Sequence, residues 1–165
     1  MSEDPGQKLM QKAGALLARR PFSRAELAAR LARYGDPAQI DPVLDRLEEL
    51  NLLNDAEYAY NSAVRWLQQQ GWGALRVLHM LRRRHIDAAT AEAALARARL
   101  EIGERAALEA YLERRARTHP LPSDRRAITR LVAHLRRRGF PDEVIWTVLP
   151  RKIPGTAWRN FDLGD

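Results

Sequence analysis

The sequence predicts an all-α protein made of three tandem three-helix repeats. Ala, Leu, Arg and Glu dominate the 165 residues, and the alternation of β-branched residues that is typical of strands is missing. The middle helices of the repeats align without gaps, at an offset of 50 residues and then of 54. The aligned apolar positions are Leu27, Ala28 and Leu31; Val77, Leu78 and Leu81; and Leu131, Val132 and Leu135. A repeat of about 50 residues buries too little surface to stand alone, so we expect stacked repeats that share a core.

Gly, Pro, Asn and Asp residues separate nine expected helices. These helices are 6–19, 24–34 and 42–50; 55–70, 74–85 and 88–100; and 103–118, 124–138 and 142–150. The repeats accordingly span 1–53, 54–100 and 101–152, and we expect residues 153–165 to form a flexible tail.

Local signals justify the ends of these helices. Ser23 and Glu26 form a capping box, and Asn54 caps the helix that follows it. Asp41–Pro42 offers an N-cap with Pro at the first helical position, and Gly73 serves as an N-cap. At the other ends, we expect the two glycines at 35 and 139 to adopt left-handed C-cap conformations.

The overall composition indicates a basic cytoplasmic protein. The chain has no cysteine, which fits a reducing compartment, and shows neither a signal peptide nor an apolar run long enough to cross a membrane. Its net charge is +7, with zero in residues 1–53, +3 in 54–100 and +4 in 101–165. The second and third repeats should therefore meet an anionic partner.

Arginines mark the middle helices of these two repeats. Arg76 and Arg83 share the outer face of one helix, and Arg130 and Arg137 are their equivalents. Arginines at a helix C-terminus complement the macrodipole, but that effect does not explain Arg76 and Arg130, which lie early in their helices. We therefore predict an anion-binding surface. Its residues are Arg76, Arg82, Arg83, Arg84, Arg130, Arg136, Arg137 and Arg138.

Three segments together resemble the RecX family of regulatory proteins. They are Ser23–Ala59, the Gly-Trp-Gly helix Gly71–Ile86, and Ala127–Leu149. The resemblance implies an elongated, curved array of three-helix units that binds the RecA–DNA filament. It also implies a non-enzymatic regulator that inhibits or modulates the ATPase, strand-exchange and coprotease activities of RecA, and some family members bind bare DNA. This chain departs from the family pattern with Asn51 for Gly, Asn54 for Asp, and Asp36 for an apolar residue after Gly35.

Other functions have less support in the sequence. No two of the four histidines are spaced three or four residues apart, so we expect no metal site, and without a phosphate-binding loop or a catalytic dyad we expect no cofactor and no enzymatic activity. The main alternative is a free-standing DNA-binding protein that inserts a helix-turn-helix-like unit into a groove. A basic amphipathic membrane helix is less favoured, because the apolar faces match between repeats as a core would. We expect the protein to be a monomer. Its arginines bind either DNA phosphates or acidic groups of the recombinase, and the sequence does not distinguish between the two.

Overall fold

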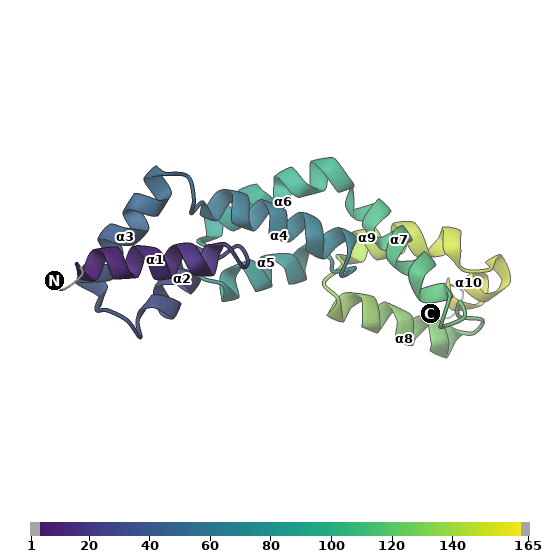
Figure 1. Ribbon diagram of the computed structural model, residues 1–165. Coiled ribbons are helices and arrows are strands. Elements are labelled where there is room, and N and C mark those ends of the chain that lie inside the picture. The colour runs from purple at the N-terminus through teal and green to yellow at the C-terminus, as the bar shows by residue number, and fades with distance from the viewer. Residues whose placement is uncertain (1–3, 163–165) are drawn as a thin grey trace. The chain divides into compact units, whose positions relative to one another are not determined.

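The computed structural model describes residues 4–162, and every regular element in that range is an α-helix (Figure 1). The helices are α1 (Pro5–Leu17), α2 (Arg24–Leu31), α3 (Pro37–Glu49), α4 (Asp55–Gln68), α5 (Ala74–Arg83), α6 (Ala88–Ile102), α7 (Glu104–Ala116), α8 (Arg125–Arg137), α9 (Asp142–Lys152) and α10 (Gly155–Asp162). All nine expected helices are present, so the all-α prediction is confirmed.

The chain divides into two compact units. The first combines Met1–Asn61 with Leu81–Ala94, and the second combines Ser62–Met80 with Leu95–Asp165. Residues 54–100, which the sequence groups as one repeat, therefore contribute to both units.

Helices α1, α2 and α3 pack against one another in the first unit. The apolar positions of α2 and α3 follow the helical period, so that one face of each helix is buried. The buried core consists of Leu9, Ala13, Phe22, Leu27, Leu31, Ile40, Val43, Leu44, Leu47 and Leu53.

In the second unit, α9 packs against α7 and α8, and α10 packs against α8. Its core includes Leu131, Val132 and Leu135, three of the positions aligned from the sequence. The other core members are Leu108, Leu112, Ile128, Phe140, Val144, Ile145, Val148, Leu149, Ile153 and Ala157.

Helix α3 begins five residues before the predicted start at 42. The expected cap at Asp41–Pro42 is wrong, because Asp36 and Gln39 form a complete capping box and Pro37 occupies the first turn. The earlier start places Ile40 on the same face as Val43, and both side chains are buried. Burial of Ile40 thus favours the longer helix although Pro42 lies inside it.

The two glycines expected to end middle helices behave differently. Gly139 has a φ of 87°, as predicted, and Phe140 behind it is 1% exposed. Gly35 does not have a positive φ, so that prediction is wrong. A left-handed cap is favoured when the next residue makes an apolar contact with the helix, and the residue after Gly35 is Asp36.

The segment expected to be a flexible tail contains a helix over most of its length. Residues 155–162 form α10, in which Ala157 is buried. The Trp158 and Phe161 rings lie 6.0 and 5.9 Å from the Trp146 ring of α9. This apolar contact between aromatic side chains stabilises a short helix that its own propensity would not. Residues 163–165 of the predicted tail lie outside the described residues.

Among the described residues, no helix combines the length and the apolar character that crossing a membrane requires.

Candidate nucleic-acid interface

The sequence has two runs of three arginines, residues 82–84 and 136–138, which we call the arginine triplets. The first arginine of each triplet forms an ion pair with an acid of the following helix. Arg82 lies 3.5 Å from Glu92 of α6. Arg136 donates from Nε and Nη2 to the two oxygens of Asp142, at 2.7 and 2.8 Å. This hydrogen bonding raises the pKa of Arg136 and lowers that of Asp142. Both arginines remain exposed, so each keeps one side toward solvent.

The third arginine of the first triplet, Arg84, is half-buried in the first unit. Its Nη1 donates to Glu26 Oε1 at 2.7 Å and to the Tyr58 hydroxyl at 2.9 Å. Its carbonyl accepts a hydrogen bond from Ser23 Oγ at 2.9 Å. Arg84 therefore ties the end of α5 to the starts of α2 and α4.

Glu26 is held in its charged form at this junction. Burial acts to raise the pKa of Glu26, but hydrogen bonds from Ser23 N–H and Tyr58 and the nearby charge of Arg84 outweigh burial and lower it. The Glu26 side chain is only 19% exposed. Loss of Arg84 would remove the closer of the two cations beside this mostly buried carboxylate, since Arg20 Nη1 lies 3.7 Å from Glu26 Oε2.

Arg138, the third arginine of the other triplet, has an equivalent place in the second unit. Its Nε donates to the Gly71 carbonyl at 2.8 Å, and its Nη2 donates to the Gln70 carbonyl. The guanidinium lies 4.5 Å from the centre of the Tyr111 ring. Arg138 thus binds carbonyls just before α5, as Arg84 binds groups at the starts of α2 and α4.

The backbone completes the junction between α5 and α8. Gly73 N–H donates to the Arg138 carbonyl at 2.8 Å, and Leu75 N–H donates to the Gly139 carbonyl at 3.1 Å. These bonds satisfy N–H groups at the start of one helix with carbonyls at the end of another. A Cβ at position 73 would lie 2.3 Å from the Gly139 carbonyl, so this close approach requires glycine.

Arg76 belongs partly to the same junction. Its guanidinium lies 4.5 Å from the Trp72 ring centre, and its Nη1 donates to the Arg137 carbonyl at 3.4 Å. Its Nε is buried without a hydrogen-bond partner. The helical pattern placed Arg76 opposite the apolar face correctly, but could not show that α8 ends against it.

Three of the eight predicted residues are left with unpaired side chains. Arg83, Arg130 and Arg137 are exposed, and within residues 4–162 their guanidinium groups make no ion pair or hydrogen bond. Such guanidinium groups are free to bind phosphate or carboxylate. The predicted residues thus fall into three groups. Three are unpaired, Arg82 and Arg136 pair with acids on the surface, and Arg76, Arg84 and Arg138 hold helix ends together.

The first repeat carries a group of cations that the sequence pattern did not indicate. A hollow of about 220 Å³ is lined by Lys12 and Arg19 from α1 and its end, by Arg30 of α2, and by Arg33 and Tyr34 behind α2, with Ala15 and Leu16 completing its wall. We call this feature the cationic hollow. Its charged residues come from separate helices, so a pattern along one helix does not reveal it.

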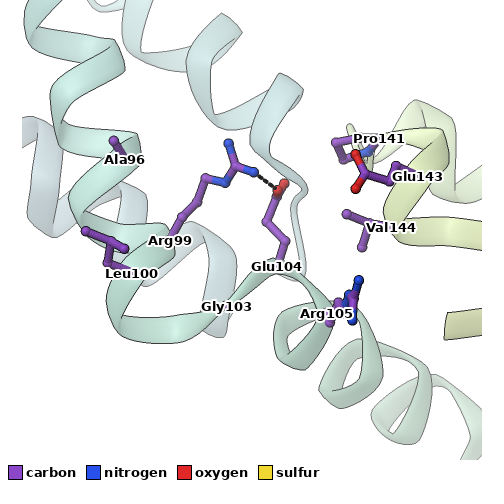
Figure 2. Close-up of a pocket in the computed structure, with 9 residues that line it drawn as sticks. All are labelled: Ala96, Arg99, Leu100, Gly103, Glu104, Arg105, Pro141, Glu143 and Val144. Atoms are coloured by element: carbon purple, nitrogen blue, oxygen red, sulfur yellow. Dashed lines mark ion pairs between the residues drawn. The ribbon is translucent and has the colours of Figure 1, made fainter. Parts of the chain in front are cut away.

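A second hollow, of about 620 Å³, has mixed charge. Figure 2 shows Glu104 between Arg99 on one side and Glu143 and Val144 on the other. Arg99 Nη2 lies 2.7 Å from Glu104 Oε2, and Glu104 Oε1 is buried without a partner. Two arginines and two glutamates line this hollow, which gives it no preference for a highly charged anion.

The aromatic and histidine side chains of the second unit lie in pairs. Trp66 is 5% exposed, and the centre of its ring lies 5.3 Å from that of Trp72, so the two rings pack together. His134 Nε2 is 2.6 Å from the Tyr111 hydroxyl. Within residues 4–162, no three His, Cys, Asp or Glu side chains are grouped so that they could hold a metal ion.

Comparisons with known proteins match this repeat pattern. Models of the first, second and third three-helix domains of RecX match residues 10–47, 54–95 and 103–149. The chain belongs to the RecX family. It is 39% identical to the regulatory protein RecX of Halorhodospira halophila over 126 residues, which are 76% of each chain. It is 31% identical to that of Chromobacterium violaceum over 147 residues, covering 87% of this chain and 90% of the relative.

Solved structures of RecX support the same fold. The crystal structure of RecX from Lactobacillus salivarius matches with a TM-score of 0.74 at 22% identity, over 91% of this chain and 97% of that one. The prediction of three tandem three-helix repeats is therefore confirmed. The RecX relatives are named as regulatory proteins, and the residues that bind a partner remain a prediction.

Proposed function

We propose that this chain binds the RecA–DNA filament in the cytoplasm and inhibits its ATPase, strand-exchange and coprotease activities. The observation that carries the proposal is membership of the RecX family through all three of its domains. The relatives are named as regulatory proteins, which supports a regulator that catalyses no reaction of its own. We propose that it acts as a monomer.

The unpaired arginines are the proposed contacts with the filament. Arg83, Arg130 and Arg137 present exposed guanidinium groups that can meet phosphate oxygens in a bidentate manner. Arg82 and Arg136 lie beside them in sequence and add positive potential, although each already pairs with an acid. Arg76, Arg84 and Arg138 act indirectly, because their contacts fix the helix ends that present the other five.

The test compares wild type with the triple variant Arg83→Ala, Arg130→Ala, Arg137→Ala. The readouts are ATP turnover by RecA on single-stranded DNA and the affinity for the assembled filament at several salt concentrations. We expect wild type to slow ATP turnover and the triple variant to lose most of this effect. If the arginines bind phosphates of single strands, each contact adds about −0.7 to the slope of log affinity against log salt, so the triple variant should flatten it by about two units.

A control variant removes the same charge elsewhere. Arg65, Arg105 and Arg151 are exposed and lie outside the triplets, so their replacement by Ala should leave inhibition nearly intact. Equal losses in both variants would show that net charge alone matters. If wild type binds bare DNA as tightly as the filament and leaves ATP turnover unchanged, a free-standing DNA-binding protein is the correct function instead.

A further inference from the structure

The first repeat carries local positive charge that its zero net charge conceals. Lys12, Arg19, Arg30 and Arg33 line the cationic hollow, and none of the described residues that line it is acidic. Helix α1 contributes no Asp or Glu along its whole length. Four cations around one hollow of about 220 Å³ raise the potential there well above that of the repeat as a whole.

Four acids of this repeat pair with cations that lie outside the hollow. Arg24 Nη2 lies 2.7 Å from Asp45, and Arg24 Nη1 lies 2.7 Å from Glu48. Glu26 pairs with Arg84, and Glu49 pairs with Arg46. Within residues 4–162, the four cations of the hollow form no ion pair with an acid.

An exposed aromatic ring stands at the edge of the cationic hollow. Tyr34 is 53% exposed, and Lys12 Nζ lies 5.5 Å from the centre of its ring. Tyr34 and Lys12 also line a neighbouring hollow of about 350 Å³, together with Lys8, Leu9 and Gln11. A charged hollow and a partly apolar one thus share an aromatic wall.

We propose that these two hollows bind single-stranded nucleic acid, with a phosphate on Arg19, Arg30 and Arg33 and the adjoining base against Tyr34. Alternating phosphates and unpaired bases match a cationic hollow next to an exposed aromatic ring, because every base offers a face for stacking. A duplex keeps its bases paired and stacked inside, so it would use the cations but not the ring. The inference rests on the proposed function for its setting, since the filament contains single-stranded DNA.

The charge test uses a labelled oligothymidylate without any recombinase. Replacing Lys12, Arg19, Arg30 and Arg33 by Ala should lower the affinity and flatten the salt slope by about two to three units. All four side chains are exposed, so the fold should persist, which circular dichroism checks. The matched control replaces Arg65, Arg105, Arg117 and Arg151, and an equally flattened slope in this control would overturn the proposal.

The stacking test uses Tyr34 alone. Tyr34→Ala should weaken oligothymidylate binding about 5-fold or more without changing the salt slope, while Tyr34→Phe should bind as wild type does. Neither change should affect duplex binding. Equal affinity of Tyr34→Ala and wild type for oligothymidylate would overturn the assignment to single strands. Because RecA is absent, a failure here is separate from a failure to slow RecA turnover.

Discussion

The three arginines of each triplet make three different kinds of contact. The first arginine pairs with an acid of the next helix, the second is unpaired, and the third anchors a junction, as Arg84 and Arg138 show. Successive residues on a helix point about 100° apart, so three neighbours face three different surroundings. The sequence predicted an arginine cluster, but assigning each member required the packed structure.

Replacing Arg84 should destabilise the protein, whereas replacing its neighbour Arg83 should not. Arg84→Ala removes the closer of the two cations that pair with the mostly buried Glu26, at a cost of about 1–3 kcal/mol in unfolding free energy. Arg83→Ala changes an exposed side chain and should stay within about 0.5 kcal/mol of wild type. Urea denaturation of the two variants measures the difference, and equal midpoints would mean that the junction contributes nothing.

His134 should make the protein sensitive to mild acid. Burial, followed by the charges of Arg115, Arg138 and Arg137, lowers the pKa of His134 in the folded state. The unfolded chain, with a histidine pKa near about 6.5, then binds the proton more readily, so the unfolding free energy should fall as the pH drops below that value.

The His134→Gln variant tests this interpretation. It removes the titrating group and keeps a polar partner for Tyr111. Its unfolding free energy should vary less than that of wild type between about pH 7 and pH 5. Below that window the lowered pKa values of Glu26 and Asp142 cause their own loss of stability in both proteins. If the unfolding free energies of wild type and His134→Gln changed equally between about pH 7 and pH 5, His134 would not be the cause of the acid sensitivity.

At the scale of elements, the sequence predicted helix positions well where the signals were local. Ser23 and Glu26 form the expected capping box, and Asn54 Oδ1 accepts from Glu57 N–H at the start of α4. Helix α10 was missed because its stability depends on Trp146, which belongs to a different helix. Neighbouring residues in the sequence determine where a helix is capped, whereas contacts with other helices determine whether a short helix forms at all.

The close approach of α5 and α8 should not tolerate a side chain at Gly73. A Cβ there would lie 2.3 Å from the backbone of Gly139 and Phe140, so Gly73→Ala should cost about 2–3 kcal/mol of unfolding free energy. Gly14→Ala is the matched control, because its Cβ meets nothing within 4 Å and alanine favours a helix. Thermal melts should show a lower midpoint for the first variant and an equal or higher midpoint for the second.

At the scale of the molecule, the first repeat depends on residues beyond its own boundary. Its apolar core lies within residues 1–53, but Arg24, Ser23 and Glu26 bond to residues 55 and 84 outside that segment. We therefore expect a fragment of residues 1–53 to be largely unfolded, because a core of this size is marginal even with all its contacts. A cooperative thermal transition of the fragment by circular dichroism would show that the repeat folds independently.

The distribution of charge was predictable only in part. Net charges by segment identified the second and third repeats as basic, and the unpaired Arg83, Arg130 and Arg137 agree with that. The cationic hollow escaped notice because summing over residues 1–53 cancels Lys12 and Arg19 against acids that bond elsewhere. The net charge of a segment does not show whether its positive and negative side chains lie apart in the folded protein.

The contact between the start of α5 and the end of α8 also makes the junction accessible to hydrogen-exchange measurements. Amide protons in the first turn of a helix normally exchange quickly with solvent, since no carbonyl of the same helix binds them. Gly73 and Leu75 donate theirs to carbonyls at the end of α8, so both should exchange slowly. Opening of the junction exposes the two protons together, so a change that favours opening should speed the deuterium uptake of both. The protection of these two amides therefore measures how strongly the closed arrangement of the two helices is favoured.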